Sequence, residues 1–263
     1  MAVDYVNMTP KEARGLIREG KYTKQTSGMC AGYAQANLAV LPAEYAYDFL
    51  LFTQRNPKSC PVLEVSDKGS RLLKFIAPEA DIAKDIPKYR IYKNGVPDNE
   101  YTDVAQYWRE DFVSFLIGCS FSFESELLAS DVPVRHIEED RNVPMYITSI
   151  ECVPAGIFHG RMVVSMRPMP HDQVIRAVNV TATMPRVHGC PVHIGDPSII
   201  GISDISKPDF GDSVTIHPGE VPVFWACGVT PQSVIMSVKP RIAITHAPGH
   251  MLITDVKNTL LKY

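Results

Sequence analysis

The sequence predicts a mixed α/β fold whose sheet includes a parallel β-α-β portion. Segments with strand-like apolar runs alternate with segments at helical spacing along the whole chain. In the last third, a strand at 221–228, a short helix at 230–238 and a strand at 241–249 follow in close succession, as in a right-handed β-α-β unit. The length of 263 residues fits one domain over 1–263, and the alternative is a smaller α+β domain inserted in the middle of the chain.

The N-terminal part begins with a helix that has its own start and stop signals. Thr9 is a candidate N-cap, Pro10 fits the first helical position, and Glu12 completes a capping box. Gly20 is suited to end this helix. The sequence next predicts a glycine-rich loop from residue 26, a strand at 36–41, a helix at 43–54 and a strand at 60–65.

The middle of the chain mixes loops, helices and strands. YKNGVPDNEY (92–101) is typical of a hairpin or an exposed loop. Apolar residues at helical spacing predict a helix at 104–118 and, after a GCSFS loop, a short helix at 123–130. The remaining elements expected here are strands at 145–152 and 161–168 and a helix at 171–184.

Composition narrows the function classes. Hydrophobic residues make up 45% of the chain, charged residues 21%, and the formal net charge is -3. We therefore expect no nucleic-acid partner and no membrane partner. The candidate carboxylate-binding groups described below predict an acidic small molecule as substrate. MAVDYVNMTPKEAR lacks the pattern of a secretion signal, which predicts a cytoplasmic location. A homo-oligomer is a general expectation for such proteins.

Two turns could place cysteines at helix N-termini. In WACGVTPQS, a strand ends at Cys227-Gly228 and Thr230 is the expected N-cap of the next helix; in IGCSFSFE, Ser120 or Ser122 could cap a helix, with Glu124 close behind. The alternative is ordinary helix capping. A helix N-terminus would lower the thiol pKa of Cys119 or Cys227, so a racemase-like pair of thiols is one hypothesis.

Two arginines are candidate clamps for a substrate carboxylate. Arg55, in QRNP with Asn56, and Arg135 each lie at the end of a predicted element beside polar residues. Arg55 could equally bind helix-terminal carbonyls. His136 precedes the acidic run EEDR, which is typical of a solvated turn, and it is therefore not selected.

HGCPVHIGDP (188–197) combines two histidines with glycines and prolines that exclude a helix. General acid/base use of His188 or His193 is favoured over metal binding, although a structural role stays open. The sequence assigns no cofactor; if a magnesium or manganese ion is bound, Asp196 and Asp204 are the candidate ligands. THAPGH adds Thr245 and His246 at a predicted strand end.

Several segments together resemble one family, the hydro-lyase family that is also called the D-glutamate cyclase family. The similarity runs from about Thr26 to Asp255, and FLIGCSFSFE and VPVFWACGVTPQ are its most specific parts. Members often have a cysteine where this chain has Thr53 and a proline where it has Ser59. The resemblance implies a lyase with a fold peculiar to the family, and the activity attributed to a relative is cyclisation of D-glutamate to 5-oxo-D-proline.

This chemistry suggests roles for the candidate residues. His188 or His193 would move a proton, Arg55 or Arg135 would bind the α-carboxylate, and backbone N–H groups at Cys119-Ser120 or Gly228-Val229 would hold the oxyanion. The alternatives are a hydratase or dehydratase of another small acid, and a small-acid binding protein without turnover. The full set of expected substrate contacts comprises Arg55, Asn56, Arg135, Ser120, Ser122, Gly228, Thr230, Gln232, Thr245 and His246.

Overall fold

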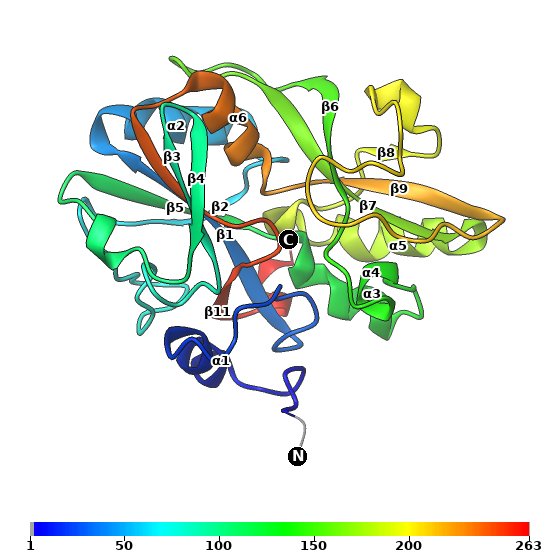
Figure 1. Ribbon diagram of the computed structural model, residues 1–263. Helices are drawn as coiled ribbons and strands as arrows, with labels where there is room; N and C mark the ends of the chain where they lie inside the picture. The colour runs from blue at the N-terminus through cyan, green and yellow to red at the C-terminus, as the bar shows by residue number, and fades with distance from the viewer. Residues whose placement is uncertain (1–2, 263) are drawn as a thin grey trace.

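The computed structural model describes residues 3–262, so the two ends of the expected 1–263 domain lie outside the described residues. It contains two antiparallel sheets that lie side by side (Figure 1). The seven-stranded sheet has the order β2-β5-β1-β10-β3-β4, and β11 also pairs with β1. Its strands are β1 (Tyr33–Pro42), β2 (Val62–Val65), β3 (Tyr89–Lys93), β4 (Val96–Tyr101), β5 (Phe112–Gly118), β10 (Ile242–His246) and β11 (Leu252–Lys257).

The four-stranded sheet has the order β6-β7-β9-β8. Its strands are β6 (Met145–Glu151), β7 (Arg161–Pro170), β8 (His193–Ile194) and β9 (Glu220–Ala226). The α-helices are α1 (Pro10–Arg18), α2 (Ala43–Arg55), α3 (Glu124–Ala129), α4 (Arg135–Glu138), α5 (Val174–Ala182) and α6 (Thr230–Val238). The α/β class is therefore confirmed.

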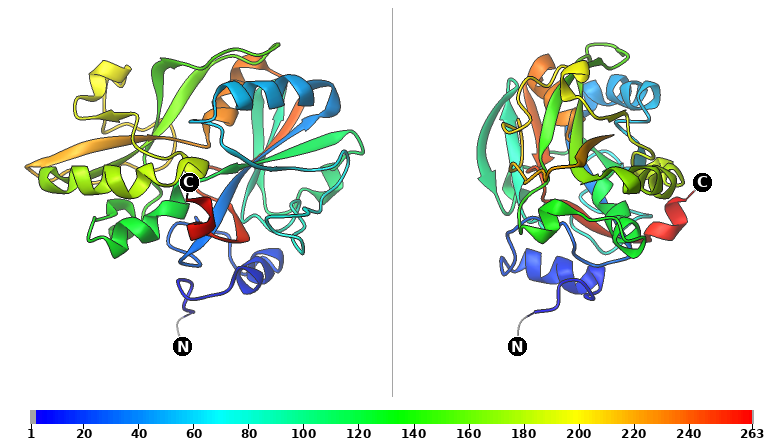
Figure 2. Two further views of the ribbon diagram at one scale, coloured as in Figure 1. Left: turned by 180° about the vertical axis from the view of Figure 1, so that it is seen from behind. Right: turned by 90° about the vertical axis from the view of Figure 1, so that its right-hand side faces the viewer.

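Each sheet is covered on both faces. Side chains of α2 and α6, including Phe52 and Ile235, pack on one face of the seven-stranded sheet, and residues from the irregular segment 73–86 pack on the other. Helices α3 and α5 lie below the four-stranded sheet (Figure 2). Side chains of both helices form one buried cluster with Trp225 of β9. Residues 192–216 contribute to the core on the opposite face of this sheet.

The prediction of a parallel β-α-β unit is wrong. Its two strands, β9 and β10, belong to different sheets, and every strand pair in the described part of the chain is antiparallel. Helix α6 carries the chain from one sheet to the other (Figure 1). The predicted order strand, helix, strand is confirmed, but this order does not determine which strands pair.

The expected helix at 104–118 is also wrong. Only Ala105–Tyr107 form a 3-10 turn, and Phe112–Gly118 form β5 between β1 and β2. FVSFLIG is almost fully buried, because both faces of this strand are covered. A short continuous apolar run suits a strand of this kind as well as a buried helix.

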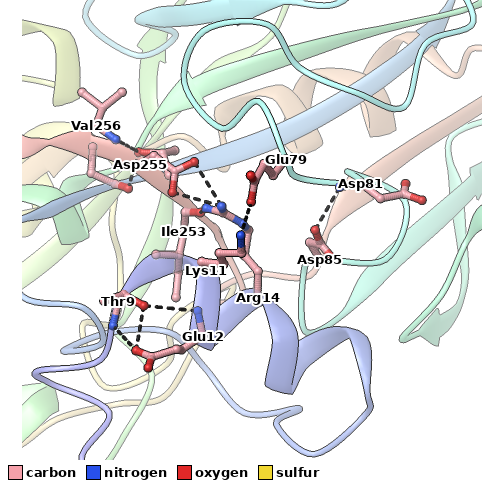
Figure 3. A network of polar contacts seen from close by, with 12 residues as sticks. Thr9, Lys11, Glu12, Arg14, Glu79, Asp81, Asp85, Ile253, Asp255 and Val256 are labelled. Carbon is pink, nitrogen blue, oxygen red and sulfur yellow. Dashed lines mark hydrogen bonds and ion pairs between the residues drawn. The ribbon is translucent and has the colours of Figure 1, made fainter.

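The N-terminal helix forms as the sequence predicts. Thr9 and Glu12 make the capping box, and Gly20 follows the helix with φ 68°. Arg14 anchors the helix to β11: its guanidinium lies 2.8 Å from the Ile253 carbonyl oxygen and 3.0 Å from Asp255 (Figure 3).

Candidate active site where the two sheets meet

The segment 118–124 carries the chain from β5 into a 3-10 turn (Ser120–Phe123) and then into α3. Cys119 caps the turn, and its sulfur accepts a hydrogen bond from the Phe121 N–H. The segment is fixed to β1, because the Cys119 N–H donates to the Gln35 carbonyl and the Gln35 N–H donates to Ser122 Oγ. This arrangement brings Glu124 inside the protein, where its side chain is 2% exposed.

Three side chains surround the Glu124 carboxylate. Oε1 lies 2.5 Å from an Arg167 terminal nitrogen and 3.0 Å from His136 Nε2, and Oε2 accepts a 2.8 Å hydrogen bond from Ser27 Oγ. Burial alone would raise the pKa of Glu124, but the charges and hydrogen bonds of His136 and Arg167 outweigh it and lower the pKa to about 2. Glu124 is therefore ionised throughout the physiological pH range.

Arg167, in the middle of β7, is 0% exposed. Besides Glu124, it donates to Ser165 Oγ at 3.1 Å and to Ser120 Oγ at 3.2 Å. The guanidinium carbon lies 5.2 Å from the centre of the Phe123 ring and 5.6 Å from that of Trp225, which adds cation–π contacts. Its Nε has no hydrogen-bond partner among the described residues.

His136, on α4, is 1% exposed, which shows that the expectation of a solvated turn is wrong at this position. Its Nε2 lies between Glu124 Oε1 and Ser27 Oγ, the latter at 3.2 Å. Its ring stacks on Phe121 with centroids 6.0 Å apart. A histidine that a carboxylate orients in this way is suited to proton transfer.

A cavity of about 120 Å³ opens beside this cluster. Glu124 contributes to its wall, and the other walls come mainly from the loop 28–33 and from apolar side chains such as Phe121 and Leu128. Gln35 holds this loop by donating from Nε2 to the Thr26 and Met29 carbonyls. A small molecule in the cavity would therefore lie against Glu124.

Two further buried acceptors lie on the same face of β1. Gln35 Oε1 and Asn37 Oδ1 have no hydrogen-bond partner among residues 3–262. Asn37 donates to the Gly118 carbonyl at 2.8 Å and packs against Gly228, where an added Cβ would lie 1.9 Å from Asn37 Nδ2. The close approach requires glycine at position 228.

Cys119 and Cys227 belong to one buried cluster, but the prediction that a helix N-terminus lowers their thiol pKa is wrong. Burial raises the pKa of Cys119 well above its ordinary value, and it raises the pKa of Cys227 to about 11. Desolvation of a thiolate outweighs the favourable N–H groups at these turns. Both cysteines belong to a buried apolar cluster that also includes Phe121 and Val229.

Some expected substrate contacts lie in or beside the Glu124 cluster, and others stabilise the fold next to it. Ser120 accepts a hydrogen bond from Arg167, whereas Ser122 binds the Gln35 N–H and Gly228 packs against Asn37 beside the cluster. Thr230 is not the N-cap of α6, because Val229 has that position. The Thr230 hydroxyl donates to the Cys227 carbonyl at 2.7 Å.

Gln232, Thr245 and His246 form a separate buried network. Gln232 Nε2 and the Thr245 hydroxyl both donate to the His246 carbonyl, at 2.9 and 2.8 Å. His246 Nδ1 lies 3.1 Å from the Leu38 N–H. Burial lowers the pKa of His246 to about 3, so the ring is neutral at physiological pH.

The two histidines of HGCPVHIGDP lie in different surroundings. His188 is 0% exposed, and its Nδ1 lies 3.0 Å from the Lys58 carbonyl oxygen. Burial lowers the pKa of His188 to about 4. His193, on β8, is partly exposed, with Nε2 2.7 Å from the Asp196 carbonyl oxygen and its ring against Phe224. Neither histidine hydrogen-bonds to the Glu124 cluster.

The predicted arginine clamps are engaged by the protein itself. Arg55 donates to the Pro154 carbonyl. Asn56, at the end of α2, donates from Nδ2 to the Val153 carbonyl and accepts from the Val153 N–H at Oδ1. Arg135 is 7% exposed and forms ion pairs with Glu220 at 2.6 Å and with Glu138 at 2.9 Å.

The candidate metal ligands lie in surface loops. Asp196 caps the turn at Pro197–Ile200, and Asp204 pairs with Lys207 and Ser206. Among the described residues, no group of three or more His, Cys, Asp and Glu side chains could hold a metal ion. In the same part of the chain, no helix combines the length and apolarity needed to cross a membrane.

The sequence alone does not identify Ser27, Glu124, His136 or Arg167 as site residues. The clearest signal is that of Arg167, because RMVVSMRP places a charge inside a largely apolar strand. A buried arginine needs a carboxylate partner, but the sequence does not say which one. Ser27 gives no signal of its own.

Comparison with known proteins identifies the family. The D-glutamate cyclase family matches residues 113–255, more than half of the chain. The chain belongs to the D-glutamate cyclase family. The matched range includes Glu124, His136 and Arg167, whereas Ser27 and Gln35 precede it. The family assignment makes the chain an enzyme of the lyase kind, as the sequence predicts.

Relatives similar over nearly their full length are named as hydro-lyases. The "Putative hydro-lyase" of Clostridium beijerinckii is 72% identical, covering 99% of this chain and 100% of that protein. "Putative hydro-lyase YcsI" of Bacillus subtilis is 61% identical, covering 97% of this chain and 99% of that protein. A nitrogen repressor-like protein from Methanococcus jannaschii aligns with a TM-score of 0.38 and 10% identity over 89% of this chain and 91% of that chain, which is too low to support an argument.

Proposed function

We propose that this lyase removes water from a small acidic substrate at the Glu124–His136 site, and that its reaction is the cyclisation of D-glutamate to 5-oxo-D-proline. The observation that carries the proposal is the position of His136 Nε2 between a buried carboxylate and a serine hydroxyl. The adjoining cavity, which Glu124 helps to line, gives a substrate a place next to this cluster. Membership of the D-glutamate cyclase family supports the choice of reaction.

The proton balance of this reaction requires a relay. The substrate nitrogen forms a bond to the γ-carboxyl carbon while one carbon–oxygen bond breaks. An ammonium nitrogen with three protons becomes an amide nitrogen with one, and the departing oxygen takes the other two protons as water. No net proton enters or leaves, so one group that faces both the amine and the leaving oxygen is sufficient.

In the proposed mechanism His136 is this relay. Glu124 orients the imidazole and stabilises its positive charge, and it remains an anion because its pKa is about 2. Arg167 offsets the negative charge of Glu124, so an acidic substrate does not meet an uncompensated anion. The free acceptors Gln35 Oε1 and Asn37 Oδ1 would bind the substrate's N–H groups, and Arg167 Nε would bind a carboxylate oxygen.

The experiment compares two histidine variants. The purified protein is incubated with D-glutamate, with L-glutamate and with 5-oxo-D-proline, and products are followed by proton NMR. His136→Asn is expected to lower turnover of D-glutamate by about 100-fold or more. The control is His171→Asn, because His171 is exposed and should not affect turnover. His188 and His193 are tested in the same way as alternative proton carriers.

Two results would contradict the proposal. Full activity of a correctly folded His136→Asn protein would remove His136 from the mechanism. Absence of 5-oxoproline from wild-type mixtures, together with turnover of another small acid, would keep the site but exclude this substrate.

A further inference from the structure

A second cavity, of about 280 Å³, lies between two segments that are far apart in the sequence. Pro57 and Lys58, which follow α2, form one side, and the other side comes from Ala182 and the turn 185–190. The turn packs against the end of β5, where a Cβ on Gly118 would lie 2.1 Å from the Arg186 carbonyl oxygen. This cavity and the one beside Glu124 share no lining residue.

Lys58 gives this second cavity a positive charge. Its ammonium group donates to the carbonyl oxygen of Cys190 and lies 3.5 Å from the Cys190 sulfur. Lys58 forms no ion pair with any carboxylate within residues 3–262. A partly buried ammonium without a counter-ion favours an anionic ligand.

His188 gives the cavity a hydrogen-bond acceptor, which calls for a donor group on the ligand. Its side chain is fully buried and lines the cavity, and its backbone has φ 82°, which is strained for a residue other than glycine. A carbonyl oxygen only accepts hydrogen bonds, so the Nδ1 atom that faces the Lys58 carbonyl carries the proton of the neutral ring. Nε2 is then an acceptor, and it has no hydrogen-bond partner among the described residues.

We propose that this cavity binds a small carboxylic acid that also has an O–H or N–H donor next to its carboxylate. The carboxylate pairs with the Lys58 ammonium, and the donor group hydrogen-bonds to His188 Nε2. Pro57, Ala182 and Pro185 supply the apolar contacts for the carbon skeleton. The proposal does not depend on the chemistry at Glu124.

Cys190 allows occupancy to be measured at this site. It is partly exposed, whereas Cys30, Cys60, Cys119, Cys152 and Cys227 are buried. Iodoacetate is a small carboxylate, and iodoacetamide is its neutral counterpart; with either one, the sulfur displaces iodide and forms a bond to the CH₂ carbon. Peptide mass spectrometry gives the alkylation rate of Cys190 with each reagent.

Lys58→Gln is expected to lower the ratio of the iodoacetate rate to the iodoacetamide rate by about fivefold. The exposed Lys68 is the matched control, and Lys68→Gln should leave the ratio unchanged. A local change of structure would alter both rates together, so the ratio isolates the charge. An unchanged ratio in Lys58→Gln would overturn the proposal.

Protection of Cys190 from iodoacetamide tests the ligand class. Lactate, which has a hydroxyl next to its carboxylate, should protect at lower concentration than propionate, which has none. Equal protection by the two acids would overturn the role of His188, and absence of protection by both would overturn the site. Protection by inorganic phosphate as strong as that by lactate would exclude specificity for a carboxylic acid.

Discussion

Replacing Glu124 by glutamine would leave the charge of Arg167 buried without a carboxylate partner. Arg167 is 0% exposed and Glu124 is 2% exposed, and removing one partner of such a pair typically costs about 3–5 kcal/mol. The pKa gives an independent figure: lowering it from 4.5 to about 2, at about 1.4 kcal/mol per pKa unit, corresponds to about 3 kcal/mol. We therefore expect Glu124→Gln to lower the free energy of unfolding at pH 7 by about 3 kcal/mol.

The loss should depend on pH in a defined direction. The pKa of Glu124 is lower in the folded state than in the unfolded state, so its contribution is complete above about pH 4.5 and is lost as the pH falls towards 2. Urea unfolding of wild type and Glu124→Gln at a series of pH values measures this difference. The difference in free energy of unfolding between the two proteins should be largest at pH 7 and should shrink as the pH falls from about 4.5 towards 2.

The matched control is Glu79→Gln. Glu79 forms an exposed ion pair with Lys11 and should contribute little to stability (Figure 3). A gap between wild type and Glu124→Gln that stays constant from pH 7 to pH 3, or that is no larger than for Glu79→Gln, would refute the reasoning. A second check is the replacement of both Glu124 and Arg167 by apolar residues, which should recover part of the lost stability.

Three further predictions follow from local geometry. Gly228→Ala should destabilise the protein and lower turnover, because the new methyl group would lie 1.9 Å from Asn37 Nδ2; thermal unfolding and the NMR assay measure the two effects. Lys239→Gly should stabilise the protein by about 0.5–1 kcal/mol, since Lys239 ends α6 in the left-handed region with φ 56°, and a lower melting temperature would contradict this. In a thiol titration of the native protein at pH 8, Cys190 should react first, and Cys119 and Cys227 should react only after unfolding, because burial raises their pKa values.

Local signals in the sequence predicted local structure well. The capping box at Thr9 and Glu12 starts α1, and the Asn94-Gly95 pair forms the turn of the β3–β4 hairpin within YKNGVPDNEY. Each of these features is determined by neighbouring residues. Such signals do not depend on the rest of the fold.

Strand pairing could not be predicted in this way. The run VPVFWACGVTPQSVIMSV is compatible with a crossover back to the same sheet and with a crossover to a second sheet. The outcome depends on contacts with β7, which pairs with β9 from Val164 to Pro170. FVSFLIG presented the same problem, because its burial comes from layers that are distant in sequence.

The residues of the candidate site come from the loop at Ser27 and from β1, α3, α4 and β7. The sequence indicated the importance of the turn at Cys119 and Ser120, with either its thiol or its backbone N–H groups as the functional part, but it assigned proton transfer to His188 or His193. The structure shows why the thiol hypothesis is wrong: the turn is buried, and burial opposes the thiolate more strongly than the turn's N–H groups favour it. Burial of this kind depends on how the two sheets pack and cannot be deduced from a turn motif.

The ion pair between Glu124 and Arg167 links the candidate site to the architecture. Glu124 follows the last residues of β5 in the seven-stranded sheet, whereas Arg167 belongs to β7 of the four-stranded sheet. The same contact therefore joins the two sheets and holds the carboxylate that orients His136. A change that moved one sheet relative to the other would therefore displace Glu124 and, with it, His136, the proton-transfer group that we propose. Stability and activity should accordingly fall together in variants of this ion pair, and the site cannot form on either sheet alone.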